Sequence, residues 1–223
     1  MAASNTLGLR ICTEFNRTEK SWIERARAIP VAVIGDCAQR LQGLPAGFNH
    51  YGGRQQFAGP VLTVRVRPGD NLFLHKALDL AQPGDVIVTD ADGETRTAII
   101  GAMMTNYARS RNIEAMVIDG AIRDVKELAQ IDISVLARGA TPNGPFKSGP
   151  GEIGYPISCG GVSICAGDLI VGDEDGAVVI PQAHVEDVIL AAEEKYRLEQ
   201  SWEKQIANGT WDRSWVDEAL GKL

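Results

Sequence analysis

Short apolar runs and helical stretches alternate along the middle of the chain, and this alternation restricts the possible folds more than any other feature. Asp85–Thr89, Ala115–Ile118 and Ile133–Ala137 are short and rich in apolar and β-branched residues, as buried strands are. Between them, Gly101–Arg111 has a helical composition and Arg123–Ala129 a short helical pattern. A strand–helix–strand–helix–strand order implies right-handed crossovers and a largely parallel sheet. The sequence therefore predicts an α/β fold.

The flanking segments extend this core on both sides. Val61–Val66 predicts a further strand, and Asn71–Ala81 a helix. The long pattern from His184 to about Ala207 predicts a helix with more charge than a core position needs, which favours packing on another subunit. We therefore expect a single αβ domain over residues 1–182, which carries the site, and a C-terminal helical extension over residues 183–223.

Composition excludes several classes of protein. The 223 residues include 22 Lys plus Arg and 29 Asp plus Glu, for a formal charge of −7. An acidic chain without a long basic cluster argues against a nucleic-acid partner or an anionic membrane surface. No apolar stretch approaches the roughly 18 residues that span a bilayer, and the four cysteines form no C-x-x-C pair. These features predict a cytoplasmic protein with no nucleic-acid or membrane partner.

Familiar catalytic motifs are missing. The chain has three histidines and no H-E-x-x-H, which argues against a His-rich zinc site. It also lacks G-x-G-x-x-G and G-x-S-x-G. Gly139–Gly161 is too rich in Gly and Pro for a helix, and a loop of this length is usually functional or interfacial. His75 is expected to be a packing or surface histidine.

A possible anion site begins at Gly101–Met104. A helix start offers unpaired backbone N–H groups and positive potential, and a residue without a Cβ lets an anion approach the backbone closely. In an open parallel sheet such helix starts lie beyond the carboxyl ends of the strands, where ligands bind. We interpret this segment as a carboxylate cradle, with an ordinary turn as the alternative.

The next helix start carries adjacent charges of opposite sign, Arg123 and Asp124. A cation in a first helical turn is electrostatically misplaced unless an anion lies there, and a guanidinium can grip a carboxylate with two parallel hydrogen bonds. Asp124 is either an acid favoured by the helix dipole or an oxygen ligand for Mg²⁺ or Mn²⁺. A cradle, an arginine and a metal-binding carboxylate would together suit a 2-oxo acid, whose enolate oxygen they would stabilise.

Two segments carry a family resemblance. GAMMTNYARSRNIEAMVIDGAIRD (residues 101–124) and residues 138–181 resemble the family of 4-hydroxy-4-methyl-2-oxoglutarate aldolases, which are divalent-metal-dependent class II pyruvate aldolases. The family also includes the regulator of ribonuclease E activity A. The resemblance implies a layered αβ fold of the swivelling phosphohistidine-like type with a partly parallel central sheet. It also implies homotrimers, or homohexamers built from trimers, with sites between subunits.

The resemblance also implies roles for single residues. Pyruvate would be held by Arg123 and by the backbone of four residues, Gly101, Ala102, Met103 and Met104. Asp124 would bind Mg²⁺, or Mn²⁺, directly or through water. A glutamate from a neighbour's C-terminal helix would complete the site; Glu199 is the best match, and Glu193, Glu194 and Glu203 compete with it.

One position departs from the family pattern. Aldolase members often have an acidic residue after the first glycine, as an outer partner of the metal, and here that residue is Ala102. The sequence thus predicts a carbon–carbon lyase that cleaves a 4-hydroxy-2-oxo acid to pyruvate and a second carbonyl product, with oxaloacetate decarboxylation as a side activity. The alternatives are a non-catalytic, protein-binding regulator of ribonuclease activity, or a related lyase with another substrate.

Overall fold

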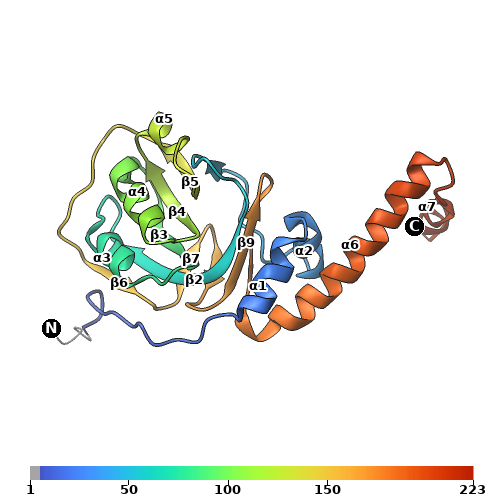
Figure 1. The fold of residues 1–223 in the computed structure, drawn as a ribbon, viewed down its shortest axis with the longest axis horizontal. Helices are drawn as coiled ribbons and strands as arrows, with labels where there is room; N and C mark the ends of the chain where they lie inside the picture. The colour runs from blue at the N-terminus through green and yellow to red at the C-terminus, as the bar shows by residue number, and fades with distance from the viewer. Residues whose placement is uncertain (1–5, 223) are drawn as a thin grey trace.

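The computed structural model describes residues 6–222 and is a mixed α/β structure (Figure 1). The helices are α1 Lys20–Arg27, α2 Val31–Cys37, α3 Leu72–Leu80, α4 Ala102–Ser110, α5 Val125–Leu128, the 3-10 helix η1 Gln182–His184, α6 Val185–Ala207 and α7 Ser214–Leu220. The strands are β1 Asn49–His50, β2 Phe57–Val66, β3 Val86–Ile100, β4 Ala115–Ile122, β5 Ser134–Ala140, β6 Gly151–Ile153, β7 Ile157–Cys159, β8 Val162–Ile164, β9 Leu169–Asp173 and β10 Gly176–Ile180.

The main sheet is parallel at its centre and antiparallel at its edges. Its strand order is β1-β5-β4-β3-β2-β9-β10, with β6 also paired to β2. The β2–β3, β3–β4 and β4–β5 pairs are parallel, whereas β1, β6, β9 and β10 pair antiparallel. The parallel centre confirms the crossovers that the alternating sequence predicts. It also brings the ends of β3 and β4, and the helix starts after them, to one edge of the sheet.

Helices cover the sheet on two sides (Figure 1). One apolar cluster joins α3, α4 and α5 to the central strands through residues such as Leu74, Met104 and Leu128. Another joins α1, α2 and the first half of α6 to β9 and β10. In α6 the buried residues are Val185, Ile189 and Ala192, so this half of the helix belongs to the core of its own chain.

Most of the predicted elements are present, with two differences near the site. The strand predicted to end at Thr89 continues as β3 to Ile100, because the Asp-rich segment after Thr89 stays within the strand. The helix predicted over Arg123–Ala129 is shorter, as α5, because the left-handed backbone of Asp124 cannot belong to a right-handed helix. The first difference lengthens a strand past polar residues, and the second moves the start of a helix past a left-handed turn.

The second half of α6 extends away from the body, with α7 at its far end (Figure 1). Leu198, Trp202 and Ile206 are 48%, 37% and 53% exposed along it. Within residues 6–222, no helix is both long and apolar enough to cross a membrane. The swivelling fold type and the packing of this arm on a neighbouring subunit stay predictions.

Strand β2 passes so close to the backbone of Gly84 that position 59 must be glycine. A Cβ on Gly59 would lie 2.3 Å from the Gly84 carbonyl oxygen, which belongs to the backbone and cannot move aside alone. We expect Gly59→Ala to lower the free energy of unfolding by about 1–3 kcal/mol through overpacking. Gly43→Ala is the control, because nothing lies within 4 Å of the added methyl group. Urea denaturation of both variants measures their free energies of unfolding. Equal values would contradict the close approach of Gly59 to the Gly84 carbonyl oxygen.

Candidate active site

The ends of β3 and β4 build the site together. Ile100 and Ile122 are paired at these ends, and the Arg123 backbone N–H donates to the Ile100 carbonyl oxygen at 3.0 Å. The chain then turns from β3 into α4 at Gly101, and from β4 toward α5 at Asp124. The sequence-predicted cradle and the charged pair are therefore side by side.

Gly101 is needed for space. Its φ of −157° is extended backbone that any residue adopts. A Cβ at Gly101, however, would lie 2.3 Å from Asp124 Oδ2 and 3.0 Å from Arg123 Cγ. The missing side chain lets the two charged residues lie against the start of α4.

The Asp124 side chain is hydrogen-bonded to the start of α4. Its backbone is in the left-handed region, with φ +61° and ψ +41°, and its Oδ2 accepts a hydrogen bond from the Ala102 N–H at 3.0 Å. Asp and Asn tolerate this conformation better than most residues. The sequence interpretation of Arg123 and Asp124 as residues of a first helical turn is wrong, since both precede α5.

The Arg123 guanidinium is free to bind a ligand. Its Nε lies 3.6 Å from Asp124 Oδ2, beyond hydrogen-bond distance for a strong pair, and the side chain is 45% exposed. Within residues 6–222 this guanidinium makes no hydrogen bond. The Gly139–Gly161 segment lies against the Arg123 guanidinium, so close that a Cβ at Gly144 would be 3.0 Å from Arg123 Nη1.

The start of α4 also offers donors. The Ala102 N–H is used by Asp124, which leaves the N–H groups of Met103 and Met104 without intrahelical partners. These N–H groups and the helix dipole favour an anion at this end. The Met104 side chain is buried, whereas that of Met103 is 87% exposed.

These groups line a cavity of about 300 Å³, which is the size of a small-molecule site. Its wall includes Gly101, Met103, Met104, Arg123 and Asp124. A second hollow, lined in part by Thr141 and Pro142, adjoins it on the other side of Arg123 and Asp124. The charged pair therefore lies between two open spaces.

Sequence reasoning missed three residues of the cavity wall, Asn71, His75 and Lys147. His75, interpreted as a packing or surface histidine, lines the cavity, because the helix that carries it packs beside α4. Burial and the nearby charge of Lys147 lower the pKa of His75 below its usual value. The sequence signal that could have found Lys147 was the Gly- and Pro-rich segment around it, whose length already indicated a functional loop.

Among the residues that line the cavity, Asp124 has the carboxylate that could hold a divalent cation. Residues 6–222 contain no cluster of three or more His, Cys, Asp or Glu side chains that would hold a metal. Asp124 supplies a half-exposed carboxylate whose Oδ2 is already oriented by Ala102. Mg²⁺ is often bound through one or two carboxylates plus waters and substrate oxygens, so a single oriented carboxylate is compatible with it.

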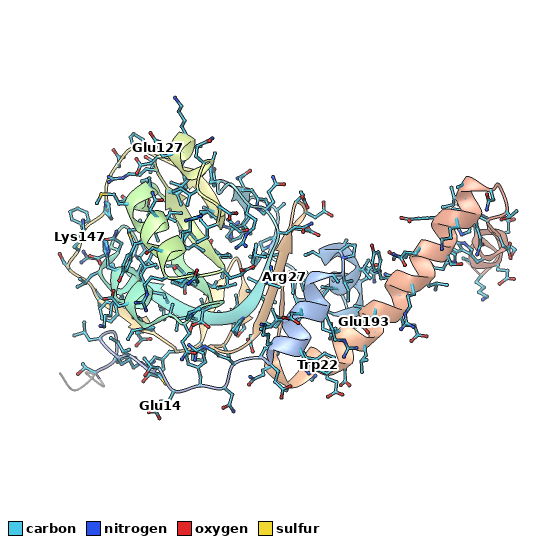
Figure 2. The ribbon with its side chains drawn as sticks, in the orientation of Figure 1. Glu14, Trp22, Arg27, Glu127, Lys147 and Glu193 are labelled. Atoms are coloured by element: carbon cyan, nitrogen blue, oxygen red, sulfur yellow. The ribbon has the colours of Figure 1, made fainter. Side chains whose placement is uncertain are left out.

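Glu199 does not reach this cavity within one chain. It lies on α6 and pairs with Lys195, whose ammonium also contacts Asp36 of α2. Figure 2 shows the separation, with Lys147 beside the cavity helices and Glu193 on α6, across the sheet. The competing Glu193 is held by Arg25 in two hydrogen bonds of 2.7 Å. Completion of the site by a glutamate of a neighbour stays a prediction.

Comparison with known proteins assigns the chain to a family. The model of the RraA-like family, described as Aldolase/RraA, matches residues 31–179. A 4-hydroxy-4-methyl-2-oxoglutarate aldolase from Thermus thermophilus is 37% identical over 149 residues, which cover 67% of this chain and 90% of that protein. A protein from Halalkalibacterium halodurans, named provisionally for the same activity, is 39% identical over 193 residues, 86% of this chain and 92% of its own length.

A solved structure is also similar over most of the chain. The Streptomyces coelicolor protein RraAS2, described as an unusual member of the RNase ES inhibitor RraA family, superposes with a TM-score of 0.76 at 26% identity. The match covers 84% of this chain and 98% of that one. The extent of the family match and the identity to these relatives lead to one conclusion: this chain belongs to the RraA-like family of aldolases and RraA proteins.

Proposed function

We propose that this chain is a divalent-metal-dependent class II pyruvate aldolase. It cleaves a 4-hydroxy-2-oxo acid into pyruvate and a second carbonyl compound. One observation carries the proposal: Arg123, whose guanidinium makes only a long ion pair, and Asp124, whose carboxylate is oriented by a hydrogen bond, lie against the N-terminus of α4 in one cavity. The names of the aldolase relatives support the same reaction class.

Substrate binding uses two kinds of donor. The N–H groups of Met103 and Met104 bind the substrate's C1 carboxylate at the positive end of α4. The Arg123 guanidinium then bridges the same carboxylate and the 2-oxo group, as its planar fork allows. This arrangement places the 2-oxo group beside Asp124.

The reaction breaks the C3–C4 bond. Transfer of the 4-hydroxyl proton to water turns C4 into a carbonyl carbon, and the electron pair of the broken C3–C4 bond moves to the C2 oxygen as the pyruvate enolate. Arg123 stabilises that oxygen, and a proton returned to C3 completes pyruvate. Asp124 would hold Mg²⁺ or Mn²⁺, which supplies Lewis-acid polarisation of the 2-oxo group when bound. Oxaloacetate decarboxylation gives the same enolate and is expected as a side activity.

The exposed arm supports a site that is shared between subunits. Glu199 lies on α6 among Leu198, Trp202 and Ile206, which a lone chain leaves open to solvent. An apolar surface of this kind usually marks an interface. We therefore include in the proposal a homotrimer or homohexamer in which a neighbour's arm brings Glu199 toward Arg123 and Asp124.

A second candidate function follows from the solved relative. RraAS2 is described as belonging to a family of ribonuclease inhibitors, and it matches this chain over 84% of its length. A protein-binding inhibitor would need neither Arg123 nor Asp124. A pyruvate-release assay over a panel of 4-hydroxy-2-oxo acids and oxaloacetate, with and without EDTA, separates the two functions. The lyase predicts release that EDTA abolishes, and the inhibitor predicts none.

Asp124→Asn tests the metal ligand. Asn tolerates the left-handed backbone of position 124 and its side-chain oxygen still accepts from Ala102, so the fold should be retained. Because the amide carries no charge, we expect Mg²⁺ stimulation of pyruvate release to be lost. Titration of Mg²⁺ against initial rate measures this, and unchanged stimulation would remove Asp124 from the metal site.

Gly101→Ala tests the contact between the two segments. The added methyl group would displace the Asp124 carboxylate and the Arg123 side chain, both of which can move without unfolding the protein. We expect kcat/KM to fall by at least about 10²-fold, as when a transition-state donor is lost, with little change in Tm. Gly43→Ala serves again as the control. Wild-type kinetics in Gly101→Ala would show that the contact is dispensable.

Complementation tests the shared site. Arg123→Lys and Glu199→Gln should each be nearly inactive, because one loses the planar fork and the other the neighbour's carboxylate. When both variants are co-expressed with different tags, mixed oligomers contain some sites with Arg123 from one chain and Glu199 from the next. Recovered pyruvate release in the doubly purified sample is the expected result. A mixture as inactive as its parents would place the whole site within one chain.

A further inference from the structure

Another cavity lies on the face of the sheet opposite to α3, α4 and α5. Val88 and Val117 pack in the apolar cluster of the β7–β8 hairpin, whereas these helices pack against the other face. Because strand side chains alternate between faces, Asp90 and Asp119, two residues further along, lie on the hairpin side. Both line a cavity of about 430 Å³ that shares no lining residue with the candidate active site.

Four charged residues of this cavity form a row across neighbouring parallel strands. Arg65 of β2 is paired with Asp90 of β3, and Asp90 with Asp119 of β4. Asp119 in turn accepts a hydrogen bond from Arg138 of β5 at 2.7 Å. All four line the cavity. The row therefore has a guanidinium at each end and two carboxylates in the middle.

The row is accompanied by features that cost the fold stability. The carboxylates of Asp90 and Asp119 lie on paired residues and repel each other. Beside them β3 bulges, because its pairing with β4 moves from Asp90 directly to Glu94, and Asp92 has a left-handed φ of +58°. The bulge includes Asp92 and Gly93, which both line the cavity. Backbone strain of this kind clusters at functional sites.

The two arginines keep hydrogen-bond donors for a ligand. Arg138 uses its Nε on Asp119, and its guanidinium lies over the Phe48 ring, 4.1 Å from the ring centroid. Within the part of the chain that the structure describes, residues 6–222, its two Nη groups make no hydrogen bond. Arg65 is mostly exposed, and its Nε lies 3.8 Å from Asp90 Oδ2, beyond hydrogen-bond distance. Donors are therefore available at both ends of the row.

Asp90 supplies an acceptor between these donors. Its side chain is 14% exposed, and burial raises its pKa, although backbone N–H groups and Arg65 oppose the shift. A hydroxyl group that donates to Asp90 would offset part of the cost of this burial. Asp119 differs, because its Oδ1 accepts from Arg138 and its Oδ2 from the Gly160 N–H at 2.6 Å. Asp90 is thus the carboxylate of the row with more capacity to bind a ligand.

The charges of the cavity favour an uncharged ligand. Its lining includes two guanidiniums and three carboxylates, those of the row and of Asp92. An anion would lie close to the carboxylates, and a cation close to the guanidiniums. Residues 6–222 also contain no cluster of three or more His, Cys, Asp or Glu side chains that could hold a metal. Hydroxyl groups both donate and accept, so a ligand with several of them matches both kinds of side chain.

We propose that this cavity binds a neutral polyol of about the size of a monosaccharide, whose hydroxyl groups donate to Asp90 and accept from Arg65 and Arg138. The volume of about 430 Å³ is within the range of small-molecule sites. The inference goes beyond the proposed lyase function, because the site is on the other face of the sheet and binding there requires no turnover.

The first test is a titration followed by saturation-transfer NMR. The neutral probes are glycerol, ribose, glucose and myo-inositol, and the charged probes are gluconate and glucosamine, which match glucose in size. We expect at least one neutral probe to bind, and each charged probe to bind at least about 10-fold more weakly, a difference of about 1.4 kcal/mol. Binding by no neutral probe, or tightest binding by a charged one, would overturn the proposal.

Variants then locate the bound polyol. Arg65→Met and Asp90→Ala change opposite members of one contact, and each should weaken binding at least about 10-fold, as for loss of a charged hydrogen bond. Arg96→Met, which removes a largely exposed arginine of β3 outside the cavity, is the control. Asp124→Asn should bind the polyol as wild type does. Thermal unfolding verifies that each variant is folded. Binding that Asp124→Asn abolishes and Arg65→Met leaves unchanged would place the polyol in the candidate active site and refute the proposal.

Discussion

The site depends on the contact between the ends of β3 and β4. The Arg123 N–H donates to the Ile100 carbonyl oxygen, and the Asp124 carboxylate accepts a hydrogen bond from the Ala102 N–H. These two bonds connect the turn that follows β3 to the turn that follows β4. Gly101 makes the contact possible, because any side chain there would overlap Asp124. Parallel pairing of the two strands is what brings both turns to one edge of the sheet. Position, orientation and spacing of the charged groups all follow from this contact.

The electrostatics of the site are those of groups held close together without being neutralised. Asp124 gives one oxygen to the helix start and remains half exposed, and Arg123 is too far from it for a strong hydrogen bond. Lys147 likewise has no acidic partner within residues 6–222. Two ion pairs outside the cavity are closed by contrast: Arg17 binds Asp85 through two hydrogen bonds of 2.8 and 2.9 Å, and Arg25 binds Glu193 in the same way. Arg123 and Asp124 therefore keep more capacity to bind a ligand than these two closed pairs do.

Much of this arrangement was predictable from the sequence, for physical reasons. Alternating apolar and helical segments predicted the parallel centre, and parallel strands necessarily place Gly101 and Arg123 at the same edge. The exact turn at Asp124 was not predictable, because β4 continues to Ile122 through a Gly-containing segment that usually breaks a strand. Lys147 and Asn71 were missed because their approach depends on the buried Asp70, which binds backbone N–H groups of a loop 78 and 79 residues away. Such long-range contacts leave no local pattern.

The central claim is that Arg123, Asp124 and the start of α4 bind pyruvate and stabilise its enolate. Exchange of the pyruvate methyl protons with D₂O, followed by NMR, tests this directly, because it requires no knowledge of the group on C4. The account predicts that the protein with Mg²⁺ accelerates exchange, and that EDTA, Arg123→Lys or Asp124→Asn each reduce the acceleration by at least about 10²-fold. Exchange that is no faster than with Mg²⁺ alone, or that is unaffected by these changes, would contradict it.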